Sequence, residues 1–551
     1  MTVPTVRPAE DPTTAPRAPS SSEPTTPTPT RWGRFAATPL GARVAALLPL
    51  FAVLIVQTAL AYRLQNTAFE DEALYVYAGH REWAQLLHGT PTYDNYPSYF
   101  SGLPFLYPIA AAGFDYLGGL EAVRFLSLLL MLAATVLVWS VARRLYGRTP
   151  AILAAAFFGT CAPTLFLSRL ATYDSSAIFL LAVGLWTVVR TARRNPLFVL
   201  LAAPPIVLAI GVKYASALYL PTLLAVAVLT VPYAQNGALQ RPWLKGLIRA
   251  ALLGSAVAAI LAVGYASASP DLRLGLTQTT THRNLGGDPT SALVRLSLVW
   301  CGWLVVLAVI GVVSEALSQR RPNTAGPRTR AGLAAVLTAS ALLATVYQVH
   351  IHQMQSLHKH IGFGLLFAAP VAGLAVSRLS RLTAADPRRR IPGLALGLAV
   401  ALAWYAGHAA APEYGWPNSA GMVSALRPLT RDGDFKYLAE ENEVPRYYLR
   451  DSTQPYEWLT TFYFSYTTKR GRHLDGLPAY QAAIADHYFT LVVLDFGPTA
   501  ALDKQLTATL ARHGSGYHLA ATVPARTSHG TQNYYIWAID TASTTSAGRA
   551  G

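Results

Sequence analysis

The sequence is poor in charged residues for its length. Only 13% of its 551 residues are charged, whereas 52% are hydrophobic. Soluble domains carry roughly 25% charged residues. This deficit excludes an ordinary soluble protein and indicates an integral membrane protein.

Cysteine is also scarce, since the chain contains only Cys161 and Cys301, and each lies inside an apolar run. Two isolated thiols exclude a disulfide framework and a metal site built from cysteines. We expect both to behave as small buried hydrophobic residues.

Acidic residues are outnumbered by basic ones, which gives a formal net charge of +16. Such an excess can indicate a nucleic-acid partner, but here the basic residues form short clusters between apolar runs and no continuous face. Clusters of this kind are typical of cytoplasmic loops. They are Arg143-Arg144, Arg193-Arg194, Arg320-Arg321 and Arg388-Arg389-Arg390. We therefore expect no nucleic-acid partner.

Long apolar runs predict an α-helical polytopic membrane protein with about eleven spans. The expected spans are residues 39–61, 121–142, 149–167, 175–191, 197–212, 216–232, 246–268, 292–314, 331–349, 361–377 and 391–409. Residues 102–118 are interpreted as interfacial or re-entrant, because a further crossing would move every later basic cluster to the other side. Residues 197–232 have basic flanks at both ends, which predicts two crossings with a turn near Lys213.

The two ends of the chain differ from this membrane domain, residues 31–411. Residues 1–30 are rich in Pro, Thr and Ser, and we expect a disordered cytoplasmic tail. An odd number of spans then places the C-terminus outside the plasma membrane. Residues 412–551 read as an extracytoplasmic α/β domain, with strands at 488–496 and 534–540 and helices at 476–486 and 501–513. This domain lacks a phosphate-binding glycine motif, so recognition or structural support is expected of it.

The first outer loop, residues 63–101, is the leading candidate for a site. It carries Glu70, Asp71 and Glu72 where a helix-like run begins. Acids in a first helical turn complement the helix dipole and need no further role. Their position just beyond a membrane helix also suits contact with a substrate at the membrane surface, so both interpretations stay open.

Three further features fall on the same predicted side of the membrane, where ionisable residues often mark sites. Arg169 and Asp174 lie between two spans, with an ion pair between them or an interfacial anchor as the alternatives. Lys213 stands alone among apolar residues and could simply snorkel. The third feature is a histidine-rich loop that includes His358, Lys359 and His360. It predicts a positive rim for an anionic headgroup, with a zinc site or interfacial anchoring as alternatives.

Taken in order, these segments resemble the GT-C superfamily of glycosyltransferases, in its protein O-mannosyltransferase and aminoarabinose-transferase branch. The resemblance covers about residues 40–375. It rests on Asp71-Glu72-Ala73-Leu74-Tyr75, on the proline-rich Leu103-Pro104-Phe105-Leu106-Tyr107-Pro108, on the helix start from Gly119 to Arg124, on Ala142-Arg143-Arg144-Leu145-Tyr146-Gly147, and on the spacing of Arg169 and Asp174.

The resemblance implies a GT-C fold and transfer of a sugar from a polyprenyl-phosphate donor to a lipid, glycan or protein acceptor on the outer face. Asp71 would be the general base, and Glu72 and Asp174 would orient the acceptor or support the base. The cationic residues would hold the donor phosphate, and they are Arg169, Lys213, His358, Lys359 and His360. One base and no carboxylate nucleophile predict inversion.

Two other functions stay open at this point. One is a transporter or flippase of lipid-linked intermediates, although we find no internal repeat of the kind that such proteins usually show. The other is a non-enzymatic envelope protein whose outer domain binds a partner. No metal-binding residue is assigned and no cofactor is certain, but a divalent metal remains possible.

Overall fold

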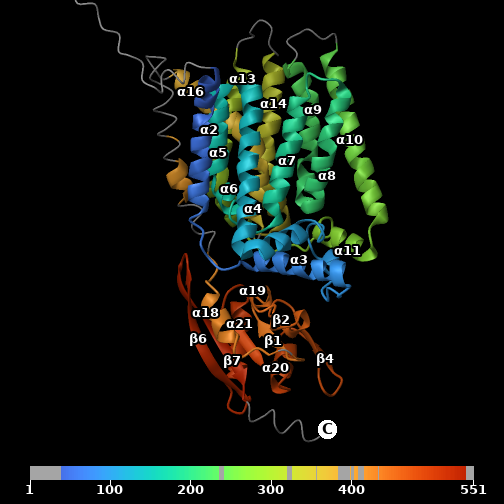
Figure 1. Cartoon of the computed structure of the whole chain (residues 1–551), viewed down its shortest axis with the longest axis vertical. Coiled ribbons are helices and arrows are strands. Elements are labelled where there is room, and N and C mark those ends of the chain that lie inside the picture. Colours follow the sequence, from blue (N-terminus) through green and yellow to red (C-terminus); the bar gives the residue numbers. More distant parts are fainter. Residues whose placement is uncertain are drawn as a thin grey trace, which may run out of the picture. The chain divides into compact units, whose positions relative to one another are not determined.

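The computed structural model describes residues 39–234, 241–318, 326–354, 356–382, 398, 402–407, 415–431 and 433–540 (Figure 1). The chain divides into two compact units, Met1–Pro49 and Leu50–Gly551. The expected tail, residues 1–30, and most of the expected last span, 391–409, lie outside the described residues.

Long apolar helices form the membrane domain, and seven helices of the described chain are long and apolar enough to cross a membrane. Each expected span up to 361–377 coincides with helical structure. The helices are α2 (Pro39–Ala61), α4 (Tyr107–Tyr146), α5 (Arg148–Thr160), α6 (Ala162–Leu167), α7 (Tyr173–Arg190), α8 (Ala203–Val212), α9 (Leu220–Ala234), α10 (Pro242–Ser267), α12 (Thr290–Ser297), α13 (Trp303–Ala316), α14 (Pro327–Ala339), α15 (Leu343–Ile351) and α16 (Leu357–Leu382). Short 3-10 segments precede α8 and α9, at Pro196–Ala202 and Tyr214–Tyr219.

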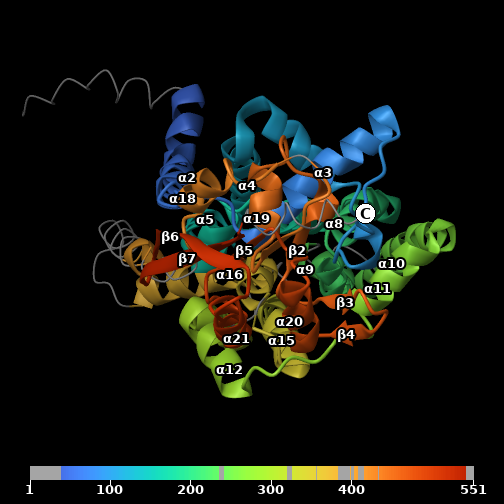
Figure 2. The same ribbon diagram turned by 90° about the horizontal axis from the view of Figure 1, so that it is seen from below.

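Helix α16 lies at the centre of this bundle, since the apolar window of its candidate span is completely buried. It packs against α4, α5, α13, α14 and α15, and Figure 2 shows it next to α5. A charged residue is tolerated in a buried helix only where an oppositely charged or hydrogen-bonding partner lies next to it. The charged residue near its start, Lys359, is therefore informative.

Helix α3 (Glu70–His88) does not follow the direction of the membrane helices. Figure 1 shows it lying across their ends. Its first turn holds three acids, which suits the positive end of the helix dipole, and Gly89 ends it in the left-handed conformation with φ 68°. Within the segment expected to be interfacial or re-entrant, 102–118, α4 begins at Tyr107, and its helical geometry breaks at Gly118 and Gly119.

The C-terminal part contains a five-stranded sheet in the order β2-β1-β5-β7-β6. Strands β1 (Tyr437–Ala439), β2 (Trp458–Thr460) and β5 (Leu491–Leu494) are parallel, while β7 (Gly530–Ile539) pairs antiparallel with β5 and with β6 (Tyr517–Thr527). Strands β3 (Ser465–Thr467) and β4 (His473–Asp475) form a separate pair. The helices are α18 (Ala420–Leu426), α19 (Glu443–Tyr448), α20 (Leu477–Ala485) and α21 (Ala500–Leu510). The expected strands and helices of this region correspond to β5, β7, α20 and α21.

Polar contacts hold this domain against the interfacial helices. Helix α19 packs on α3. The carboxylate of Asp115, on α4, accepts hydrogen bonds from the Tyr447 hydroxyl at 2.5 Å and from Arg450 at 3.2 Å. The same carboxylate lies 2.7 Å from Nε2 of His80 on α3. One buried acid therefore joins α3, α4 and the C-terminal domain.

Candidate functional site

Asp71, in the first turn of α3, forms an ion pair with Lys359 of α16. The Asp71 side chain keeps 26% of its surface exposed, whereas only 5% of the Lys359 side chain is exposed. The pair thus joins an interfacial helix to the central membrane helix. The carboxylate side of the pair is partly exposed to solvent and its ammonium side is buried.

The charges around Asp71 determine its protonation state. Burial alone would raise the pKa of its carboxyl group, but Lys359, and after it Lys213 and His358, hold this pKa below the ordinary aspartate value. Opposite charges nearby favour the ionised form of an acid. Asp71 is therefore a deprotonated, partly accessible carboxylate at neutral pH, and this group can accept a proton.

Lys213 lies beside this pair and is only 3% exposed, so the snorkelling alternative is wrong. Its Nζ donates to Ser101 Oγ at 3.1 Å and to the Tyr173 hydroxyl at 3.4 Å. It also lies 3.8 Å from Oδ1 of Asp174, which is fully buried at the start of α7. The expected alternative of an Arg169–Asp174 ion pair does not form, because Asp174 faces Lys213.

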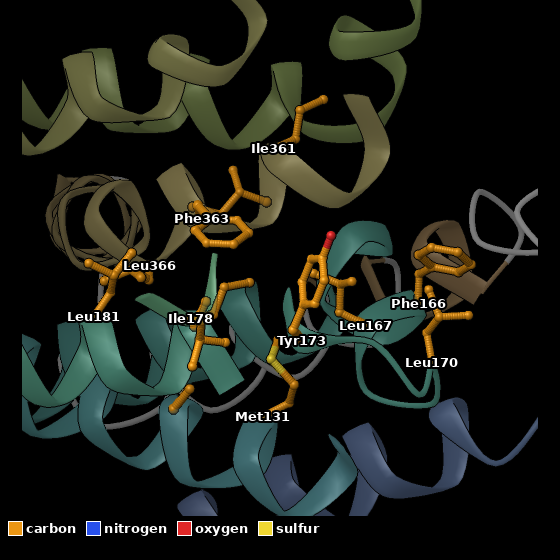
Figure 3. Close-up of a cluster of buried hydrophobic side chains, with 14 of the residues drawn as sticks. Met131, Phe166, Leu167, Leu170, Tyr173, Ile178, Leu181, Ile361, Phe363 and Leu366 are labelled. Atoms are coloured by element: carbon orange, nitrogen blue, oxygen red, sulfur yellow. The ribbon is translucent and has the colours of Figure 1, made fainter. Parts of the chain in front are cut away.

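Hydroxyl groups connect these charged side chains. The Tyr75 hydroxyl donates to that of Tyr173 at 2.7 Å, and Ser101 Oγ lies 2.6 Å from the same oxygen. Figure 3 shows the Tyr173 ring among buried apolar side chains of α4, α6, α7 and α16. Tyr75 and Tyr173 belong to the two sequence motifs quoted above, but the sequence assigned them no role.

Glu72 differs from its neighbour Asp71, because its carboxylate is fully buried and fully bonded. It accepts from Arg124 Nε at 2.9 Å and Nη2 at 2.6 Å, from the Ala171 amide at 2.7 Å and from the Phe69 amide at 2.9 Å. No oxygen of Glu72 is left to orient an acceptor. Of the two roles expected for it, the geometry favours support of the base through the position of α3.

Arg169 is placed in a different group from Asp71. Its guanidinium pairs with Glu121 and lies 4.4 Å from the centre of the Tyr62 ring. The described contacts join it to neither Lys213 nor Lys359. The structure therefore separates this predicted phosphate ligand from the others.

The two histidines flanking Lys359 do not form the expected positive rim. His358 packs edge-on against Phe166 and Trp300, with ring centres 4.8 and 5.8 Å apart. His360 is buried, and its Nδ1 lies 2.7 Å from Nε2 of Gln348. Helical geometry turns consecutive side chains by about 100°, so the three residues face different surroundings. Lys359 alone meets the carboxylate.

Arg283 is a cation that sequence reasoning missed. It lies in the loop between α11 (Pro270–Thr279) and α12, it is partly exposed, and it is close enough to Lys213 and His360 to interact with both electrostatically. Its loop has no distinctive motif, so the sequence offered no signal for it.

A separate carboxylate group in the C-terminal domain has the composition of a cation site. Ligand oxygens of Glu440, Asp495 and Asp503 all lie within 4.8 Å of one another. Burial and hydrogen bonding to Glu440 raise the pKa of Asp495 to about 10, and burial and Glu440 raise that of Asp503 to about 8. Despite its burial, hydrogen bonds lower the pKa of Glu440 to about 2. The three acids thus share protons, and no histidine joins such a group within the described ranges.

Comparisons with known proteins agree with this architecture. A family model described as dolichyl-phosphate-mannose-protein mannosyltransferase matches residues 104–263. A search of curated proteins found no match. Among solved structures, the chain is similar to the archaeal oligosaccharyltransferase AglB from Archaeoglobus fulgidus in complex with an inhibitory peptide and a dolichol-phosphate. The TM-score is 0.54 at 13% identity, over 83% of this chain and 70% of that one.

It is also similar to ArnT from Cupriavidus metallidurans bound to undecaprenyl phosphate, with a TM-score of 0.50 at 14% identity, over 90% of this chain and 98% of that one. At such identities the likeness concerns the fold. It confirms the GT-C fold that the sequence motifs predicted.

Proposed function

We propose that this protein is a membrane glycosyltransferase that transfers a sugar from a polyprenyl-phosphate donor to an acceptor hydroxyl on the outer face of the membrane. One observation carries the proposal: Asp71 is a partly exposed carboxylate with a lowered pKa, and two buried lysines lie beside it. A base and a phosphate-binding charge are the two groups that this reaction needs.

In the proposed reaction, the acceptor oxygen attacks the anomeric carbon of the donor sugar. The bond between that carbon and the phosphate oxygen breaks, and its electrons leave with the polyprenyl phosphate. Asp71 takes the acceptor proton as the new glycosidic bond forms. A well-placed general base contributes about 10²–10⁴-fold. A single displacement opposite the leaving phosphate inverts the anomeric centre.

Lys359 and Lys213 are the proposed phosphate ligands. Fixed positive charge next to the departing phosphate stabilises the charge that develops on it. Lys359 is paired with Asp71, so a donor phosphate would compete for the ammonium group. We infer that donor binding loosens the Asp71–Lys359 pair and leaves the base facing the acceptor. Asp174 would hold Lys213 in place.

The structural neighbours support the chemical class of the donor. One is described with a dolichol-phosphate and the other with undecaprenyl phosphate, and both of these are polyprenyl phosphates. We extend this donor class to the present chain as part of the proposal. The sugar and the acceptor are left open.

The test is donor consumption by the purified full-length protein. A panel of polyprenyl-phosphate hexoses and pentoses is incubated with wild-type protein and with D71N, and the released polyprenyl phosphate is measured. At least one donor should be consumed by the wild type and not by D71N. Consumption by D71N at the wild-type rate would refute the assignment of the base. The anomeric configuration of the product, read by NMR, tests inversion.

A further inference from the structure

A cavity of about 470 Å³ lies at the end of α2 nearest the C-terminal domain, and the proposed reaction does not use it. None of Asp71, Asp174, Lys213 and Lys359 lines it. Its apolar wall consists of leucines from α2, the residues just after it, and α6, namely Leu60, Leu64 and Leu165. The opposite wall includes the tip of the hairpin formed by β6 and β7.

The lining of this cavity carries positive charge that no lining carboxylate neutralises. Two arginines line it, Arg63 just after α2 and Arg526 near the hairpin tip, and its lining includes no carboxylate. Neither arginine forms an ion pair within the described part of the chain. The Arg63 guanidinium folds over Gly407, where a Cβ atom would fall 2.5 Å from its Nη1. Two unpaired guanidinium groups in one cavity form a site for an anion.

Hydrogen bonds hold the walls of the cavity together. The Asn418 amide donates to the Arg526 carbonyl at 3.0 Å. This bond fixes the hairpin tip to residues 415–419, which precede α18 and are called the linker. The linker is fixed to the loop after α2, because the Trp416 indole donates to the Thr67 carbonyl at 2.9 Å and the Ser419 amide donates to Thr67 Oγ1 at 2.8 Å. Segments about 350 residues apart therefore form one preformed pocket.

A neighbouring cavity of about 650 Å³ shares Gln65, Asn66 and Asn418 with the first. It contains Arg169, but it also contains Glu121, whose carboxylate pairs with that arginine. The charge there is already balanced. The excess positive charge belongs to the cavity of Arg63 and Arg526.

We propose that this cavity, which we call the α2–hairpin pocket, binds the headgroup of a membrane lipid whose phosphate gives it a net negative charge. Arginine is the side chain best suited to a phosphate, because its planar guanidinium binds two oxygens at once. The leucines suit the start of an acyl or prenyl chain. Asn66, Thr527 and Ser528 add neutral hydrogen-bonding groups, and the volume lies within the usual range for a ligand pocket. A bound lipid would also fasten the β6–β7 hairpin to the membrane surface.

Lipid binding by the full-length protein in detergent tests the proposal without a transfer assay. Native mass spectrometry measures retention of phosphatidylglycerol, phosphatidylcholine and a polyprenyl monophosphate by wild-type protein and by R63Q/R526Q. We expect the double variant to lose at least about tenfold in affinity for the phosphate lipid, since hydrogen bonds to charged groups are the strong ones. The matched control is R470Q/R472Q, which removes the same charge from an exposed turn between β3 and β4 and should bind like the wild type.

The two anionic probes identify the source of the phosphate. Arginine-dependent retention of phosphatidylglycerol identifies a bulk phospholipid, and arginine-dependent retention of the polyprenyl monophosphate alone identifies the carrier lipid; either result supports the proposal. Wild-type affinity for both anionic lipids in R63Q/R526Q would overturn it, and so would equal retention of phosphatidylcholine by the wild-type protein. Both arginines are exposed, so the double variant should fold, and its melting temperature verifies this.

Discussion

Asp71 and Glu72 are neighbours in the sequence, yet they lie in different surroundings. Asp71 has one cationic partner on a helix almost 300 residues away and keeps a quarter of its side chain exposed. Glu72 is completely buried, with a bidentate arginine and two backbone amides as partners. Consecutive side chains on a helix point about 100° apart, so one faces the open side of α3 and the other faces the protein.

This difference separates reactivity from stability. The Glu72 carboxylate already accepts four hydrogen bonds, so it has no free position for a substrate. Its removal would leave Arg124 buried without this partner. A carboxylate with one partner and an open side can take a proton.

The largest effect is expected for D71N. Removing the base should lower the transfer rate by about 10²–10⁴-fold. The melting temperature should fall by less than in E72Q, because the Asp71 side chain is partly exposed, although buried Lys359 loses its partner. E82Q, on the same helix, is the matched control and should transfer at the wild-type rate. A D71N transfer rate within twofold of the wild-type rate would contradict the assignment of Asp71, and not Glu72, as the reactive acid.

Replacing Glu72 should damage stability instead. Breaking a buried ion pair by removing one partner typically costs about 3–5 kcal/mol, so E72Q should unfold at a markedly lower denaturant concentration. The protein that remains folded should still transfer sugar. In a double-mutant cycle, E72Q/R124Q should be less destabilised than the sum of the two single variants. Wild-type stability of E72Q would contradict the inference that Glu72 holds α3 in position through its bonds to Arg124.

D174N should have an intermediate effect that appears in donor binding. Asp174 is the carboxylate beside Lys213, at 3.8 Å, and without its charge the ammonium group loses its anchor. Interactions with charged groups are worth about 1.5–3 kcal/mol, which corresponds to roughly a tenfold or greater rise in the KM for the donor. Measuring kcat separately matters here, because a loss confined to kcat would speak against a role in donor binding.

The smallest effect on sugar transfer is expected for the carboxylates of the C-terminal domain, which act on stability. The pKa of Asp495 is raised to about 10 and that of Asp503 to about 8, so the folded state holds protons that the unfolded state releases. Their stabilising contribution is complete below the ordinary aspartate pKa and is lost as the pH rises toward these values. The slope is at most about 1.4 kcal/mol per pH unit for each proton. Melting curves of D495N between pH 5 and 9 should therefore be flatter than those of the wild type.

The sequence predicted the spans well because apolar length and loop charge are local properties. It also identified Asp71, Lys213, Lys359 and Asp174, since each is an ionisable residue in a position where such residues are rare. It could not assign their partners. Glu72 meets Arg124 across 52 residues and Arg169 meets Glu121 across 48, and no periodicity encodes such pairs. The Glu440, Asp495 and Asp503 group was missed for the same reason.

We infer that Lys359 keeps Asp71 deprotonated and that Asp71 can therefore act as the base. The pH dependence of kcat/KM for wild type, K359R and K359Q tests this most directly. The wild-type rate should stay level down to the ordinary aspartate pKa of about 3.9, because the pKa of Asp71 lies below that value. In K359Q, the nearest cation no longer offsets the rise that burial causes in the pKa of Asp71. Its acid limb should therefore move to higher pH, while K359R should resemble the wild type. An acid limb at the same pH in K359Q and wild type would contradict the account, whatever the height of the plateau.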